Sequence, residues 1–104
     1  GGMYIGSSQS SIHSSIISNN ESDSKGGGVW VGSGSNLDIM GTLISDNYSD
    51  GFGGGIFITL SSITVDRSTI ASNTVSPTIS GAGIYADGGN AVINNSIISI
   101  KTIY

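Results

Sequence analysis

The chain has 104 residues, a net charge of −4 and no cysteine, so its length allows one domain, and disulfides and cysteine-ligated metal sites are excluded. Three basic residues are too few for the basic face that nucleic-acid binding needs, and no apolar run approaches the roughly 20 residues of a membrane helix. Seventeen Ile against three Leu favours strands, because β-branched side chains suit a pleated sheet.

A glycine-containing pair followed by an apolar–aromatic–apolar triplet occurs four times in chain order. The copies begin at Gly1, Gly27, Gly54 and Ala82, so the steps between them are 26, 27 and 28 residues. An internal repeat of this length is typical of stacked architectures in which each copy adds one structural unit.

Two further segments follow the triplet in phase within each copy. In the second copy they are the alternating segment 37–39 and the segment 42–47, which has the form Ser/Thr-x-Ile-x-x-Asn. The other copies match at 10–12 and 15–20, at 63–65 and 68–73, and at 91–93 and 96–101, where Lys101 replaces Asn. Each copy therefore holds three short segments with strand-like period-two alternation, separated by turn-rich stretches.

The same pattern returns in the same direction, which predicts one coil of a parallel β-solenoid with three strands per turn. The handedness of parallel crossovers favours a right-handed coil. The predicted fold class is therefore all-β, a single right-handed parallel β-helix of about four coils at 1–26, 27–53, 54–81 and 82–104. The residues predicted to point inward are Val29, Val31, Leu37, Ile39, Ile44, Ile56, Ile58, Ile63, Val65 and Ile70.

Small polar and aromatic residues also recur in phase. We expect two inward polar ladders at bends, in which side chains hydrogen-bond along the axis. Alternation sends four aromatic residues to the outer face, where they either stack under a covering loop or form a contact strip for a partner, a neighbouring filament or a glycan. The first ladder is Ser15, Thr42, Ser68 and Ser96, the second is Asn20, Asn47 and Asn73, and the aromatic strip is Tyr4, Trp30, Phe57 and Tyr85.

The glycine pair with its apolar triplet, followed by Ile-x-x-Asn, resembles the repeat of chlamydial polymorphic outer-membrane proteins and related pectate-lyase-like surface proteins. The first motif stands at 27–30 and 54–57, and the second at 17–20, 44–47 and 70–73 with Ile for the family's Phe. The resemblance implies a right-handed parallel β-helix. It also implies an extracellular or cell-surface setting, as in adhesins and autotransporter passengers.

An enzyme of this architecture would need clustered carboxylates. Asp38 and Asp66 are two positions out of phase, and His13 shares the phase of Asp66 but lies two coils away, at about 9.6 Å. We therefore predict no catalytic, cofactor or metal residues. Glycosylation sequons stand at Asn20, Asn47 and Asn94, and the first two fall in the predicted asparagine ladder.

The sequence thus favours an extracellular structural or adhesive solenoid, with a carbohydrate-binding or polysaccharide-degrading module as the alternative and an ice- or surface-binding protein as a weaker third. The repeat begins in phase at residue 1 and its fourth copy has 23 residues. We expect end-to-end self-association or continuation in a longer chain, because solenoid ends are normally covered. A cell-surface or polysaccharide partner is also expected, without nucleic acid and without a membrane span in this segment.

Overall fold

The computed structural model describes residues 1–79 and 81–100, with the backbone alone for residues 99 and 100. All regular structure in this part of the chain is β-strand, so it holds no helix that could span a membrane.

The first coil comprises β1 (Met3–Gly6), β2 (Gln9–His13), β3 (Ile16–Ser18) and β4 (Glu21–Ser22). The second comprises β5 (Val29–Gly32), β6 (Asn36–Met40), β7 (Leu43–Ser45) and β8 (Tyr48–Ser49). The third comprises β9 (Ile56–Thr59), β10 (Ser62–Asp66) and β11 (Thr69–Val75), and the fourth β12 (Ile84–Asp87), β13 (Asn90–Asn94) and β14 (Ile97–Ile100).

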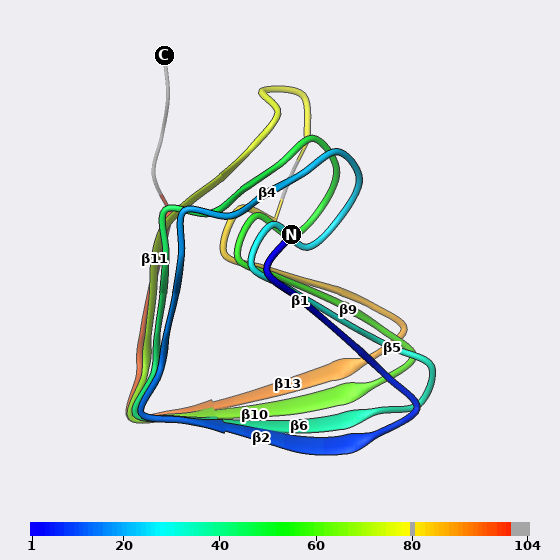
Figure 1. Cartoon of the computed structure of the whole chain (residues 1–104), viewed down its shortest axis with the longest axis vertical. Coiled ribbons are helices and arrows are strands. Elements are labelled where there is room, and N and C mark those ends of the chain that lie inside the picture. Colours follow the sequence, from blue (N-terminus) through cyan, green and yellow to red (C-terminus); the bar gives the residue numbers. More distant parts are fainter. Residues whose placement is uncertain (80, 101–104) are drawn as a thin grey trace.

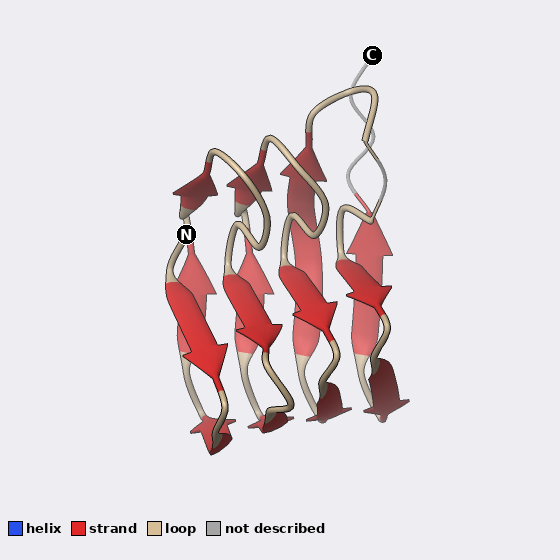
Figure 2. Cartoon of the chain, turned by 90° about the vertical axis from the view of Figure 1, so that its right-hand side faces the viewer, coloured by secondary structure: helices blue, strands red, loops and turns tan. Residues whose placement is uncertain are grey.

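Strands of successive coils stack in parallel, each directly above its counterpart. The stacks are β1-β5-β9-β12, β2-β6-β10-β13 and β3-β7-β11-β14, and the short pair β4-β8 continues into the last residues of β11. Figure 1 looks along the stack, where the coils superimpose, and Figure 2 shows them side by side as successive turns. The predicted β-solenoid is confirmed. The short fourth stack was not predicted, since two residues show no alternation pattern.

The interior is a column of aliphatic side chains. Every residue predicted to point inward in the second and third coils is buried, with at most 1% of its surface exposed. In the first coil Ile5, Ile12 and Ile17 occupy the same phases and are 7–9% exposed, because only one neighbouring coil covers them. The alternation phase derived from the repeat is therefore correct, and burial of these side chains supplies the apolar driving force for stacking.

Each strand-to-strand corner is made by one residue in the left-handed region. Such a residue turns the chain sharply between two extended segments, at roughly 1–2 kcal/mol for a non-glycine L-residue. Small polar residues and glycine fill most of these positions, and the longer side chains of Leu60 (φ 51°) and Arg67 (φ 48°) are exceptions. The corner residues are Ser7, Ser33, Leu60 and Gly88, then Ser14, Gly41, Arg67 and Asn95, then Asn19, Asp46 and Ser72.

The glycine pairs stand where successive coils pack too closely to leave room for a side chain. The left-handed residue here is the preceding glycine, such as Gly26 (φ 66°). A Cβ on Gly27 would lie 2.4 Å from the carbonyl oxygen of Gly54, and one on Gly28 would lie 2.6 Å from that of Gly55. The pair therefore lets successive coils approach closely where each coil opens.

The adjacent residues Leu43 and Ile44 test the inward phase. Ile44 is fully buried and Leu43 points outward with 36% exposed. We expect Ile44→Asp to abolish cooperative unfolding at 25 °C, because an unpaired carboxylate cannot be accommodated in a dry interior. Leu43→Asp should melt within a few degrees of the wild type, as followed by far-ultraviolet circular dichroism. Equal melting of the two variants would show that the phase is wrong.

Candidate functional site

Four aromatic side chains form a continuous ladder on the outer face of the β1-β5-β9-β12 sheet. Tyr4, Trp30, Phe57 and Tyr85 are direct partners in the parallel register, so each ring lies over the ring of the next coil. Ring centroids are 5.6 Å apart for Tyr4–Trp30 and for Trp30–Phe57, both edge-to-face, and 5.8 Å apart for the stacked Phe57–Tyr85 pair. These spacings fall in the favourable range for aromatic pairs. We call this feature the aromatic ladder.

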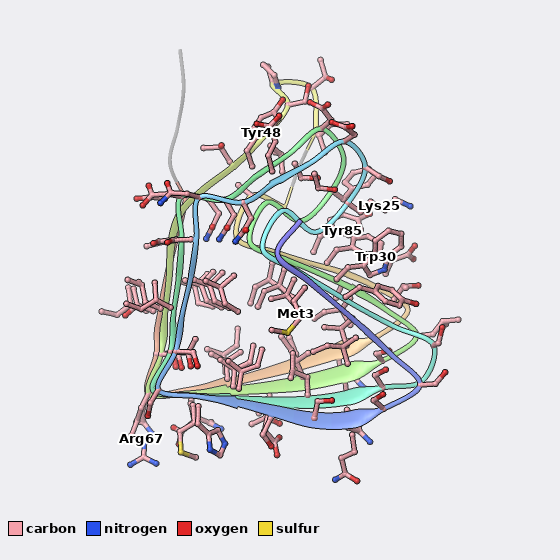
Figure 3. All side chains as sticks on the ribbon, viewed as in Figure 1. Met3, Lys25, Trp30, Tyr48, Arg67 and Tyr85 are labelled. Carbon is pink, nitrogen blue, oxygen red and sulfur yellow. The ribbon has the colours of Figure 1, made fainter. Side chains whose placement is uncertain are left out.

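Side chains from the loops between coils cover part of the aromatic ladder. The Lys25 Nζ lies over the Phe57 ring, 5.0 Å from its centroid, and the Phe52 ring stacks on Tyr85 at 4.4 Å. Figure 3 shows Lys25, Trp30 and Tyr85 gathered on this outer side. Lys25 stands two positions before the glycine pair that begins the second coil, and it contacts the aromatic residue of the third coil. Phe52 stands two positions before the pair that begins the third coil, and it contacts the aromatic residue of the fourth coil.

Coverage divides the aromatic ladder into two halves. Phe57 is only 2% exposed and Tyr85 is half-buried, whereas Tyr4 is 62% exposed. Trp30 is half-buried, and its buried indole Nε1 has no hydrogen-bond partner among the described residues. Of the two predicted alternatives, stacking under a covering loop describes Phe57, because neighbouring rings and the Lys25 side chain shield it from a partner. Tyr4 and Trp30 are the part of the strip that a partner could reach.

The first predicted polar ladder lies at the corner between the second and third strand stacks. The backbone N–H of each member donates to the side-chain oxygen of the next, at 3.4 Å from Ser15 to Thr42, 3.1 Å from Thr42 to Ser68 and 3.1 Å from Ser68 to Ser96. Each hydroxyl also donates to the carbonyl two residues earlier in its own coil. Thr42 and Ser68 are buried, and Ser15 and Ser96, in the terminal coils, are half-buried.

The asparagine ladder lies at the following corner. Asn47 accepts at Oδ1 from the backbone N–H and the Nδ2 of Asn20, both at 3.0 Å. Its own N–H and Nδ2 donate to Asn73 Oδ1 at 3.1 and 2.9 Å, and Nδ2 also donates to the Ile17 carbonyl at 3.1 Å. Asn47 and Asn73 are fully buried, and Asn20 is half-buried. The fourth-coil position, Lys101, lies outside the described residues.

A third polar ladder was missed from the sequence. The Ser8 N–H donates to Ser35 Oγ at 3.3 Å, and the Ser35 N–H donates to Ser61 Oγ at 3.0 Å. Gly34 is an extra residue at this corner of the second coil, and it also has a positive φ, 74°. The insertion shifts the spacing by one residue, which hides the alignment of the three serines. A search that allowed one inserted glycine would have found it.

The ionisable residues of the β2-β6-β10-β13 sheet line an open groove across the coils rather than meeting at one point. Asp38 pairs with Thr64, whereas Asp66 pairs with Met40, so the two carboxylates are offset as the repeat predicted. Asp66 forms an ion pair with the Nε of Arg67 at 3.3 Å. The groove is lined by Ser11, His13, Asp38, Ile39, Met40, Thr64, Asp66, Ile93, Asn94 and Asn95. Among the described residues no group of three His, Cys, Asp or Glu could hold a metal ion.

The Tyr48 hydroxyl makes a close polar contact beyond the asparagine ladder. It donates to Asp50 Oδ1 at 2.6 Å. This hydrogen bond is the main cause of a raised pKa of Tyr48, and desolvation and the negative charges of Asp50 and Glu21 act in the same direction. Tyr48 lies in β8 and Asp50 follows that strand, beyond the asparagine ladder, and we assign the pair no chemistry.

The three sequons differ in access. Asn20 and Asn47 use their amides within the asparagine ladder, whereas Asn94 is exposed at the end of β13. A glycan on Asn47 is incompatible with this packing, because the side chain has no exposed surface.

The comparisons with known proteins bear on the architecture. A family model described as the right handed beta helix region matches residues 1–100. No curated protein and no solved structure matches the chain. The match spans all four coils, including the terminal ones, and it agrees with the parallel register of the strands.

Asn47 tests the contribution of the polar ladders. Asn47→Ala removes four side-chain hydrogen bonds and leaves the Asn20 N–H without its acceptor and the Ile17 carbonyl without the Asn47 amide, while the backbone N–H of residue 47 still donates to Asn73 Oδ1. We expect a loss of about 2–4 kcal/mol in the free energy of unfolding, since each buried group left unsatisfied costs about 1–3 kcal/mol. The control Asn36→Ala alters an exposed residue and should change stability by less than about 0.5 kcal/mol. Urea unfolding of both variants measures the difference, and similar values would contradict this role.

Proposed function

The chain belongs to the right handed beta helix family, and from this premise we propose that it is a structural or adhesive segment of an extracellular β-solenoid rather than an enzyme. Its coils are held by backbone ladders and by buried polar side chains that recur from coil to coil. Such a body is a rigid spacer along its axis. Its outer faces vary from coil to coil and are available for contacts with other molecules.

The apolar interior at both ends of the stack is the observation that carries this function. Met3 is 39% exposed although it pairs with Val29, which is fully buried, and Figure 3 shows the Met3 side chain pointing into the interior. Ile93 at the other end is 42% exposed, whereas its partner Val65 is fully buried. A further coil, from a longer chain or from another copy, would bury both and continue the strand pairing.

The arrangement of carboxylates supports a non-enzymatic role. Glycoside hydrolysis needs two carboxyl groups that face each other across one bond of the substrate. Asp38 and Asp66 are offset along adjacent strands, and Asp66 is held by Arg67 and accepts from Asn95 Nδ2 at 3.4 Å. The extracellular setting is supported by the resemblance of the Gly-Gly and Ile-x-x-Asn motifs to surface-displayed repeats.

Sedimentation tests the exposed ends. We expect the 104-residue chain to associate as its concentration rises, and Ile93→Lys to reduce this association because a charge enters the surface that a further coil would cover. The matched control is Val92→Lys, which changes the outward-facing neighbour in β13 and should associate like the wild type. Analytical ultracentrifugation gives the readout, with circular dichroism to check folding. A concentration-independent monomer with cooperative unfolding would contradict end-to-end contact between copies.

A second candidate function is recognition of a polysaccharide in the open groove of the β2-β6-β10-β13 sheet. Hydroxyl, amide and carboxylate groups line it across the coils, and these are suitable partners for sugar hydroxyls. Asp38 and Asp66 make its charge negative, and the net charge of the chain is also negative. Like-charge repulsion therefore favours a neutral polymer over an acidic one.

A polysaccharide panel tests this candidate. We expect slower migration in affinity electrophoresis with a neutral polysaccharide and none with polygalacturonate, and no release of reducing ends from either. Asp38→Asn should weaken the retention several-fold, whereas Asn36→Ala should weaken it less. Absence of retention on every polymer would exclude polysaccharide binding, and release of reducing ends would show an enzyme.

A further inference from the structure

In the covered half of the aromatic ladder, two loop side chains make contacts at equivalent positions of the repeat. In each case the side chain stands two positions before the glycine pair that begins a coil, and it contacts the aromatic ring of the following coil. Lys25 does so with Phe57 through a cation–π contact at 5.0 Å, and Phe52 does so with Tyr85 through ring stacking at 4.4 Å. A cation covers the face of Phe57 through its attraction to the ring quadrupole, and a second ring covers Tyr85 by stacking, so both a cation and an aromatic ring are found at this position.

Trp30 is the next aromatic residue in the same series. By the same relation, the residue that covers it stands two positions before Gly1, in a loop that leads into the first coil. Trp30 is half-buried and its Nε1 has no hydrogen-bond partner among the described residues, beside Tyr4, which is 62% exposed. The Tyr4 hydroxyl and the Trp30 Nε1 both lie near Gly32, at 3.8 and 3.6 Å from the point where a Cβ would stand.

We propose that Tyr4 and Trp30 form a docking surface for a preceding solenoid coil whose last loop carries an aromatic or cationic side chain two positions before the junction with Gly1. This inference rests on the proposed axial stacking and adds the chemistry of the partner. Continuity with the two internal contacts supports it, because the parallel register places Trp30 in the same relation to a preceding coil as Phe57 and Tyr85 have to theirs. The charge of the chain also favours a cation at this place.

A fusion supplies the preceding coil. A copy of residues 1–26 is placed directly ahead of Gly1, so that the copied Lys25 stands two positions before Gly1. The copy contains no tryptophan, and Trp30 therefore remains the single tryptophan of the protein. Two matched versions carry Lys25→Phe or Lys25→Ser in the copied coil alone. Acrylamide quenching of Trp30 fluorescence and the melting temperature are measured for the three fusions and for the 104-residue chain.

The outcomes separate this inference from the function on which it rests. We expect all three fusions to melt above the 104-residue chain, and the Lys and Phe versions to show an at least two-fold smaller quenching constant than the Ser version. Equal quenching in three stabilised fusions would overturn the docking surface while leaving axial stacking intact. Failure of all three fusions to exceed the melting temperature of the chain, or to fold, would overturn axial stacking and the docking surface with it.

Discussion

The corner of the coil is the constraint on which the rest of the structure depends. Each turn from one strand to the next places a residue in the left-handed region, and the amide that follows has no strand partner there. A serine, threonine or asparagine oxygen of the next coil accepts that N–H, as between Thr42 and Ser68 and between Asn47 and Asn73. Without this acceptor a buried amide would be left unsatisfied, at about 1–3 kcal/mol for each corner.

Register follows from this constraint. A side-chain oxygen accepts an amide proton only when it lies directly beside it. Three such corners fix the first three coils relative to one another, and the Ser68–Ser96 corner fixes the fourth. Identical phases therefore stack, which places aliphatic residues in columns and rings in the aromatic ladder. An extra residue is accommodated where it leaves the ladder hydrogen bonds in place, as Gly34 does at the first corner of the second coil with its own positive φ of 74°. The same register leaves the outward columns free to differ, so binding specificity belongs to the outer faces.

The features that repeat along the chain could be predicted from the sequence. The phase at Gly1, Gly27, Gly54 and Ala82 gave the inward residues, and Ser/Thr and Asn at constant spacing gave two of the three polar ladders. The serine ladder through Ser35 was hidden by the inserted glycine. A covering loop over the aromatic residues was one of the two alternatives, but Lys25 was not identified as the residue that covers Phe57, because it belongs to a different phase of the repeat and contacts the ring only after two coils have stacked. Contacts between different phases depend on loop conformation, which a repeat pattern does not encode.

Amide hydrogen exchange measured residue by residue tests the central role of the corners most directly. The amides of Ser35, Thr42 and Asn47 donate to side-chain oxygens and lie outside or between the strand ladders. The account predicts that they exchange as slowly as the strand amides of Val31 and Ile44. Exchange at the rate of an exposed loop amide such as that of Asp23 would contradict it, because the side-chain ladders would then not hold one coil to the next.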